Sequence, residues 1–111
     1  MRQELWQIRL SQAAELDIAA IVMWTSDRFG ERQARRYAET ITRTITGLSM
    51  GPNLLNSRVR DDLPAGLRIH PIARRRARAR HVLIYRATEP GVVEIVRVLH
   101  EAMDFRRHVE P

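Results

Sequence analysis

The chain has 111 residues, a formal net charge of +6 and no cysteine. Its length fits a single domain over residues 1–111, and the lack of cysteine excludes disulfide bonds and thiolate metal sites. The sequence contains no long apolar run and no signal-peptide pattern, so we expect a cytoplasmic protein without a membrane partner.

The positive charge is concentrated in the second half of the chain. All 19 basic residues are arginine, and residues 56–111 hold 12 of them against 7 acidic residues. A block of arginines lies between residues 74 and 80 and consists of Arg74, Arg75, Arg76, Arg78 and Arg80. Such a block is typical of a protein with an acidic partner, which could be a nucleic acid, an acidic protein segment or an anionic membrane surface.

The first residues predict a strand followed by a helix. Trp6, Ile8 and Leu10 alternate with polar residues, which is the period of a strand. Ser11 then provides an N-cap side chain, and Gly30 ends the helix because glycine readily adopts the left-handed conformation of a helix cap. The apolar face of this helix consists of Ala14, Ile18, Ile21 and Val22, and Thr25 continues it.

A second helix is predicted to begin near Glu31 and to end before Gly51. The connection between the two helices is short, so we expect an antiparallel helical hairpin. The apolar stripe of the second helix consists of Ala34, Tyr37, Ile41, Ile45 and Leu48.

The second half of the sequence predicts three strands. After an irregular connection at residues 54–66, Leu67, Ile69 and Pro71 form an alternating segment, and two apolar strands follow at about 81–87 and 92–99. We expect the arginine-rich segment to be a hairpin loop. The predicted fold class is therefore α+β, in which an N-terminal strand and an antiparallel helical hairpin precede a three-stranded antiparallel meander, with the hairpin on one face of the sheet.

Five motifs, taken in chain order, resemble the ParE branch of the ParE/RelE toxin superfamily. They are LS at 10–11, IVMWTSDRFG at 21–30, the stretch RDDLPAGLRIHPI at 60–72, HVLIYR at 81–86, and RVLH, MD and RH within 97–108. The likeness spans nearly the whole chain. The ordered set is more specific than any one of its motifs.

The resemblance implies the toxin of a type II toxin–antitoxin system, of the kind that serves plasmid or chromosome maintenance. ParE-type toxins inhibit DNA gyrase and are held inactive by a ParD-type antitoxin, whose C-terminal segment wraps the toxin. The antitoxin usually carries the DNA-binding domain, so operator DNA would be contacted only through it. The resemblance implies no catalytic residue and no cofactor, and the histidine spacing predicts no metal site.

A first alternative is an mRNA endonuclease of the RelE type, because both branches share a fold. RelE-like enzymes usually place an Arg three residues before the strand Tyr, and a Tyr in the C-terminal tail. Those positions correspond here to Val82 and to the neighbourhood of His108, and no Tyr follows Tyr85. Both departures argue against the nuclease, although His81 and His108 could substitute chemically.

A second alternative is a small basic nucleic-acid-binding domain that uses the arginine block. The same arginines could equally pair with an acidic antitoxin tail, which we favour, or form a solvated loop. Trp24 and Phe29 are further candidates for antitoxin binding, because aromatic side chains favour interface hot spots. Tyr37 fits better as a core residue.

The C-terminal run supplies the candidates for a gyrase-facing surface: Arg97, His100, Asp104, Arg106, Arg107 and His108. His100 ends an apolar strand, and we favour a structural role in which its ring nitrogens bond the backbone and Asp104, rather than general-base catalysis. Arg97 alternates with Val96 and Val98, so we expect it on the face opposite them or paired across strands.

Overall fold

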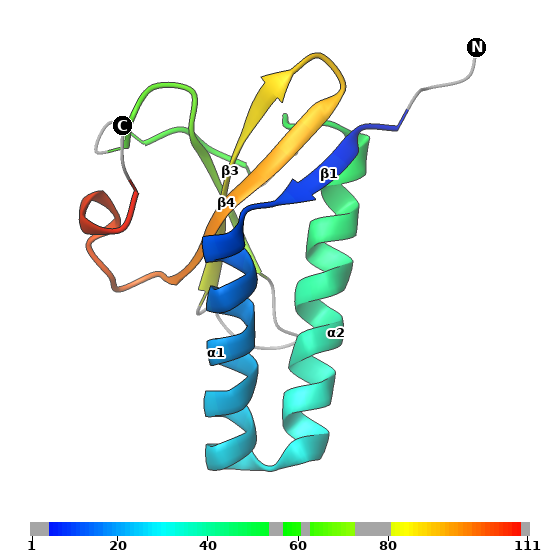
Figure 1. Cartoon of the computed structure of the whole chain (residues 1–111), viewed down its shortest axis with the longest axis vertical. Coiled ribbons are helices and arrows are strands. Elements are labelled where there is room, and N and C mark those ends of the chain that lie inside the picture. The colour runs from blue at the N-terminus through cyan, green and yellow to red at the C-terminus, as the bar shows by residue number, and fades with distance from the viewer. Residues whose placement is uncertain (1–4, 54–56, 61–62, 73–80, 110–111) are drawn as a thin grey trace.

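The computed structural model describes residues 5–53, 57–60, 63–72 and 81–109, and within them it has the predicted α+β class. Two helices pack against a four-stranded sheet (Figure 1). The elements are β1 (Gln7–Leu10), α1 (Gln12–Phe29), α2 (Glu31–Gly47), β2 (Arg68–Pro71), β3 (His81–Glu89) and β4 (Val92–His100), with 3-10 helices at Leu48–Met50 and Phe105–Arg107. Among the described residues, no helix has the length and apolar character needed to cross a bilayer.

The strands lie in the order β1-β4-β3-β2. Strands β2, β3 and β4 form the predicted antiparallel meander, and β1 joins it in parallel beside β4, with Leu10 opposite Ile95. Parallel strands require a long crossover, and the helical hairpin supplies it. Ser11 fixes the start of this crossover to the sheet, because its backbone N–H donates to Ile95 at 2.9 Å and its hydroxyl to the carbonyl of Val96 at 2.7 Å.

The two helices run antiparallel, and the turn between them projects beyond the sheet (Figure 1). Ser11 caps α1 as predicted, with its Oγ accepting from the Ala14 N–H at 3.0 Å. Gly30 alone separates the helices: its N–H donates to Ser26 at 2.9 Å and its carbonyl accepts from Ala34 at 3.1 Å. Its φ of 89° is positive as expected, but its ψ of 166° is extended rather than left-handed helical, a conformation almost restricted to glycine.

A helix-side cluster of buried residues fills the space between the hairpin and the sheet. Most of the helical residues in this cluster come from the predicted apolar stripe of α2. Tyr37 is buried, as expected of a core residue. The fully or nearly buried members are Ala14, Tyr37, Ile41, Leu48, Ile72, Leu83, Tyr85, Val93, Ile95 and Val98.

A far-side cluster covers the opposite face of the sheet. The chain after β4 folds back over this face. Phe105 and Val109 pack there with Leu63 and Leu67, and both tail residues are buried. The complete cluster is Leu63, Leu67, Ile69, Val82, Ile84, Leu99, Phe105 and Val109.

A β-bulge at Val96 changes the alternation of β4, because the register with β3 shifts by one residue there. Val96 therefore packs against the far-side cluster, whereas Val98 belongs to the helix-side cluster. We expected these two valines to share one face with Arg97 opposite them or paired across strands. The bulge separates them, and Arg97 pairs instead with Asp17 on α1.

Candidate functional site

Arg97 connects three parts of the molecule. Its Nε donates to Asp17 Oδ2 at 2.7 Å and its Nη2 to Asp17 Oδ1 at 2.8 Å, so the guanidinium holds the carboxylate at two points. Its Nη1 donates to the carbonyl of His108 at 2.9 Å, and Asp17 also accepts from the Val98 N–H at 2.9 Å. The hydrogen bond to Asp17 raises the pKa of Arg97 above its ordinary value. Arg97 thus joins α1, the end of β4 and the C-terminal tail.

The C-terminal tail presents arginines from an anchored backbone. Arg106 and Arg107 lie between the buried Phe105 and Val109, and their side chains are 70% and 83% exposed. Asp104 caps this short helix by accepting from the Arg106 N–H at 3.2 Å. Its carboxylate lies 3.7 and 3.8 Å from the two guanidinium groups, so the ion pairs are loose. The tail can therefore offer positive charge to a partner without rearrangement of the core.

His81 and His100 are brought together by the pairing of β3 with β4. They lie opposite one another in the register, and their rings meet edge to face with centroids 5.4 Å apart. Tyr37 extends from α2 so that its hydroxyl hydrogen-bonds His81 Nδ1 at 2.8 Å. The Nδ1 of His100 accepts from the Ala102 N–H at 3.0 Å. The predicted backbone contact of His100 is thus present, while Asp104 caps the tail helix instead of bonding the imidazole.

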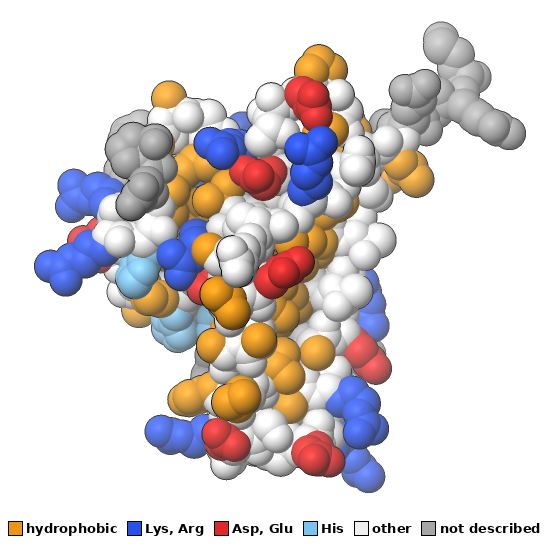
Figure 2. Space-filling view, viewed as in Figure 1, with side chains coloured by type: hydrophobic (Ala, Val, Ile, Leu, Met, Phe, Trp, Pro, Cys, Tyr) orange, Lys and Arg blue, Asp and Glu red, His pale blue; other side chains and the backbone are white. Residues whose placement is uncertain are grey.

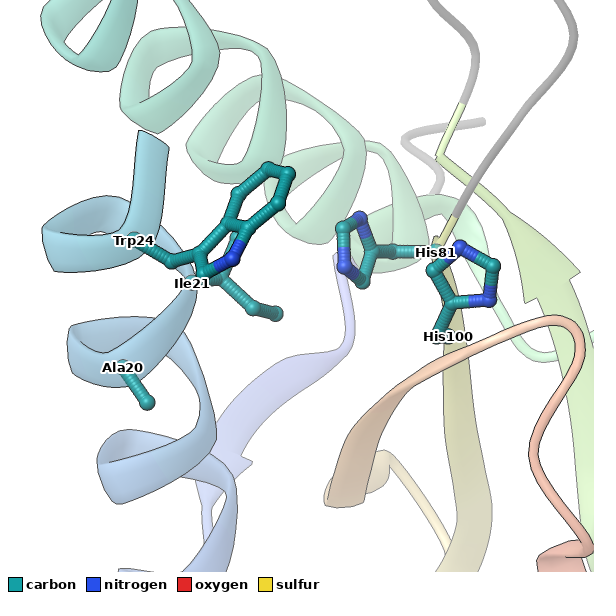
Figure 3. A pocket seen from close by; sticks show the side chains of 5 residues that line it. All are labelled: Ala20, Ile21, Trp24, His81 and His100. Atoms are coloured by element: carbon teal, nitrogen blue, oxygen red, sulfur yellow. The ribbon is translucent and has the colours of Figure 1, made fainter. Parts of the chain in front are cut away.

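A pocket of about 280 Å³ opens between this histidine pair and α1. Figure 3 shows that Ala20, Ile21 and Trp24 face it from the helix, while His81 and His100 face it from the strands. Apart from the imidazole nitrogens and the indole N–H, these side chains are apolar. No group of three or more His, Asp or Glu side chains that could hold a metal ion occurs in the part of the chain that the structure describes.

An exposed apolar surface continues from the pocket along α1, and we call Leu16, Ala20, Met23, Trp24 and Phe29 the α1 outer surface. Leu16 and Met23 are 64% and 67% exposed, although both are large apolar residues on a helix. The aromatic pair lies toward the hairpin turn: Trp24 and Phe29 meet edge to face at 5.9 Å. Arg28 covers the indole at 5.3 Å. Figure 2 shows the apolar side chains gathered along this helix.

Trp24 and Phe29, which the sequence marked as candidates for antitoxin binding, are both exposed on the α1 outer surface. Leu16 and Met23 were not predicted, although their spacing with Ala20 places them on one side of a helix whose other side already has a core face. Asp17 was not predicted either, because no local pattern indicates a partner so distant in the sequence. Arg74, Arg75, Arg76, Arg78 and Arg80 lie outside the described residues.

Comparison with known proteins decides the family. The model of the ParE toxin of the type II toxin–antitoxin system parDE matches residues 8–105. The chain belongs to the ParE toxin family. Toxin ParE1 of Mycobacterium tuberculosis is 33% identical over 100 residues, which are 90% of this chain and 94% of the relative. Toxin ParE1 of Caulobacter vibrioides is 36% identical over 102 residues, or 91% of this chain and 95% of the relative.

Solved structures support the same fold. A chain of the chromosomal ParDE toxin–antitoxin system from P. aeruginosa superposes with a TM-score of 0.73 at 16% identity, covering 88% of this chain and 98% of that one. A chain of the toxin–antitoxin complex RelBE2 from Mycobacterium tuberculosis gives a TM-score of 0.58 at 24% identity, covering 92% and 98%. The ParE-family chain therefore has the ParE/RelE fold.

Proposed function

We propose that this ParE-family toxin inhibits DNA gyrase in the cytoplasm and is neutralised by a ParD-type antitoxin. The observation that carries the proposal is the match to the ParE toxin family along residues 8–105, together with the side chain present at position 82. The exposed tail arginines, Arg106 and Arg107, are our candidates for the gyrase-facing surface, with Asp104, His100 and His108 beside them. Arg97 contributes by holding the tail in place.

The environment of Val82 argues against cleavage of mRNA. A RelE-type nuclease would carry an arginine there, to stabilise the charge that develops on the phosphate. Val82 is 5% exposed and belongs to the far-side cluster, so this side chain serves in the core. His108 lies in the tail, whereas His81 pairs with His100 at the ends of β3 and β4. His81 and His108, which could replace the arginine and the tail tyrosine of a RelE-type nuclease, therefore lie on different elements.

The α1 outer surface supports the antitoxin partnership. One side of α1 packs on the core, and its other, apolar side is available to a partner. An amphipathic helix is a common partner for an apolar surface of this kind. Arg28 and the net charge of +6 would attract an acidic segment and speed its association. Interfaces of specific complexes usually bury more than about 1,000 Å². Together with the tail, this surface gives the toxin separate regions for its two proposed partners.

A supercoiling assay tests the gyrase proposal. We expect purified toxin to block supercoiling of relaxed plasmid by gyrase and prior addition of the ParD-type antitoxin to restore it. Primer extension on translated mRNA is the companion measurement. Undiminished supercoiling, accompanied by codon-specific cuts in the mRNA, would replace this proposal with the endonuclease.

A methionine pair tests the antitoxin surface. Met23 on α1 and Met50 in the 3-10 helix after α2 are 67% and 53% exposed, so either can be changed without opening the core. We expect Met23→Ser to weaken antitoxin binding by about tenfold, since interface anchors typically contribute more than about 1 kcal/mol. Met50→Ser should leave the affinity unchanged. Equal affinities for the two variants would remove the α1 outer surface from the proposed interface.

A further inference from the structure

We infer that the pocket between α1 and the His81–His100 pair receives an apolar side chain of the antitoxin tail that has a carboxylate beside it, and that His100 donates a hydrogen bond to that carboxylate. This inference rests on the antitoxin partnership proposed above. It adds to that proposal the chemistry of one subsite. The pocket adjoins the α1 outer surface through Ala20 and Trp24.

The hydrogen bond from Ala102 fixes the tautomer of His100. A backbone N–H can only donate, so His100 Nδ1 must accept, and the proton of the neutral ring must reside on Nε2. A neutral His100 therefore presents an N–H donor, and a protonated one presents the same donor with a positive charge. His100 is exposed, so its N–H is free to donate to an oxygen of a bound partner in place of solvent.

The walls of the pocket specify the rest of the ligand. Ala20, Ile21 and the indole of Trp24 form one side, which suits an aliphatic or aromatic group. A volume of about 280 Å³ is close to the lower end of small-ligand pockets and accommodates one large side chain. The occupant is thus an anchor residue rather than a whole peptide segment.

The charges around the pocket favour a carboxylate over a neutral acceptor. Arg28 places its guanidinium over the indole of Trp24, which lines the pocket, and none of the described residues that line the pocket is acidic. Asp17, which lies one turn before Ala20 on α1, is already bound by Arg97 and by the Val98 N–H. A carboxylate from the partner therefore meets cationic and N–H donor groups. Hydrogen bonds to charged acceptors are the stronger kind.

The test compares two replacements of His100 in binding to the ParD-type antitoxin. His100→Phe keeps a flat ring and removes the donor, whereas the amide of His100→Gln places N–H donors near the position of Nε2. We expect His100→Phe to weaken binding by about tenfold and His100→Gln to stay within about threefold of the unaltered toxin. His108→Phe, the same exchange in the tail, should not alter the affinity.

A second arm identifies the acceptor. Aspartates and glutamates in the antitoxin tail are changed one at a time to their amides and measured against each toxin variant. One of these changes should weaken binding to the unaltered toxin and have no further effect with His100→Phe, which is the sign of a direct coupling.

The outcomes separate this inference from the proposed function. If the unaltered toxin does not bind the antitoxin, both are overturned. If it binds and His100→Phe binds equally well, the pocket inference alone is overturned. Equal weakening by both replacements of His100 also overturns it, because the glutamine retains the donor. Melting curves for each variant confirm that the fold is intact.

Discussion

Asp17 and Arg97 lie 80 positions apart in the chain and form a two-point ion pair at the open edge of β4. Ser11, which follows the last residue of β1, makes the first contact between the start of α1 and β4. The Asp17–Arg97 pair makes the next one, further along both elements. It is mostly sheltered, with side-chain exposures of 22% for Arg97 and 14% for Asp17. Arg97 also bonds the carbonyl of His108, so one side chain sets the position of the tail relative to the hairpin.

We predict that Arg97→Met lowers the free energy of unfolding by about 2 kcal/mol, because it leaves a sheltered carboxylate without its cation and releases the His108 carbonyl. Urea unfolding measures the change. The matched control is Arg9→Met, which breaks the Arg9–Glu89 pair, whose exposures are 52% and 55%. That change should cost less than about 0.5 kcal/mol. Equal effects of the two variants would show that the Asp17 contact contributes nothing beyond an ordinary surface pair.

Gly30→Ala should destabilise the protein by about 1–3 kcal/mol, since a side chain disfavours the combination of positive φ and extended ψ at that residue. Apart from Gly30 and its two chain neighbours, no atom of the described residues lies within 4 Å of the position that a Cβ would take, so the cost comes from the backbone conformation. Gly47→Ala is the control. Its φ of −60° and ψ of −26° are helical, and the same substitution there should be neutral or stabilising by up to about 1 kcal/mol. Thermal unfolding of both variants distinguishes the two cases.

His70 should make the protein less stable in mild acid. Burial lowers the pKa of His70, and its Nδ1 is buried with no hydrogen-bond partner among the described residues. As the pH falls below about 6.5, the ordinary pKa of histidine, His70 binds a proton in the unfolded chain. In the folded protein His70 binds that proton only at a lower pH. Stability is therefore lost as the pH falls from that value through the lowered pKa.

The measurement for His70 is the urea midpoint between pH 8 and pH 5. The decrease toward pH 5 should be smaller in His70→Gln than in the unaltered protein, because glutamine does not titrate. Parallel pH profiles for the two proteins would mean that other groups account for the whole dependence.

Arg106→Ala combined with Arg107→Ala should weaken growth arrest and gyrase inhibition. Both side chains are exposed and form only loose contacts with Asp104, so the free energy of unfolding should change by less than about 0.5 kcal/mol. Antitoxin binding should persist. The control removes the same charge elsewhere, through Arg35→Ala with Arg36→Ala on the exposed side of α2. A tail variant that remains fully toxic would exclude these arginines from the gyrase-facing surface and turn attention to residues 74–80.

The sequence alone predicted the elements and their order, because each depends on local spacing and on local chemistry. The helical period of Tyr37 and Ile41 determined a buried face, and Ser11 has the side chain that an N-cap needs. The exposure of Trp24 and of the tail arginines was also predictable, since Trp24 is not part of the predicted apolar face of its helix and the arginines follow the last predicted strand. The motifs that resemble ParE toxins were sufficient to predict the family.

The tertiary structure alone decided which distant residues meet. Strand order and register depend on how the whole core packs, so no local pattern could indicate that β1 pairs in parallel with β4 or that His81 lies opposite His100. The bulge at Val96 changes the face of the sheet on which the following residues of β4 lie. The expectation for Arg97 was wrong because it assumed that the strand alternates without a break. The far face of the sheet is buried because the tail folds back and packs Phe105 against it. This long-range contact is set by apolar packing and not by spacing along the chain.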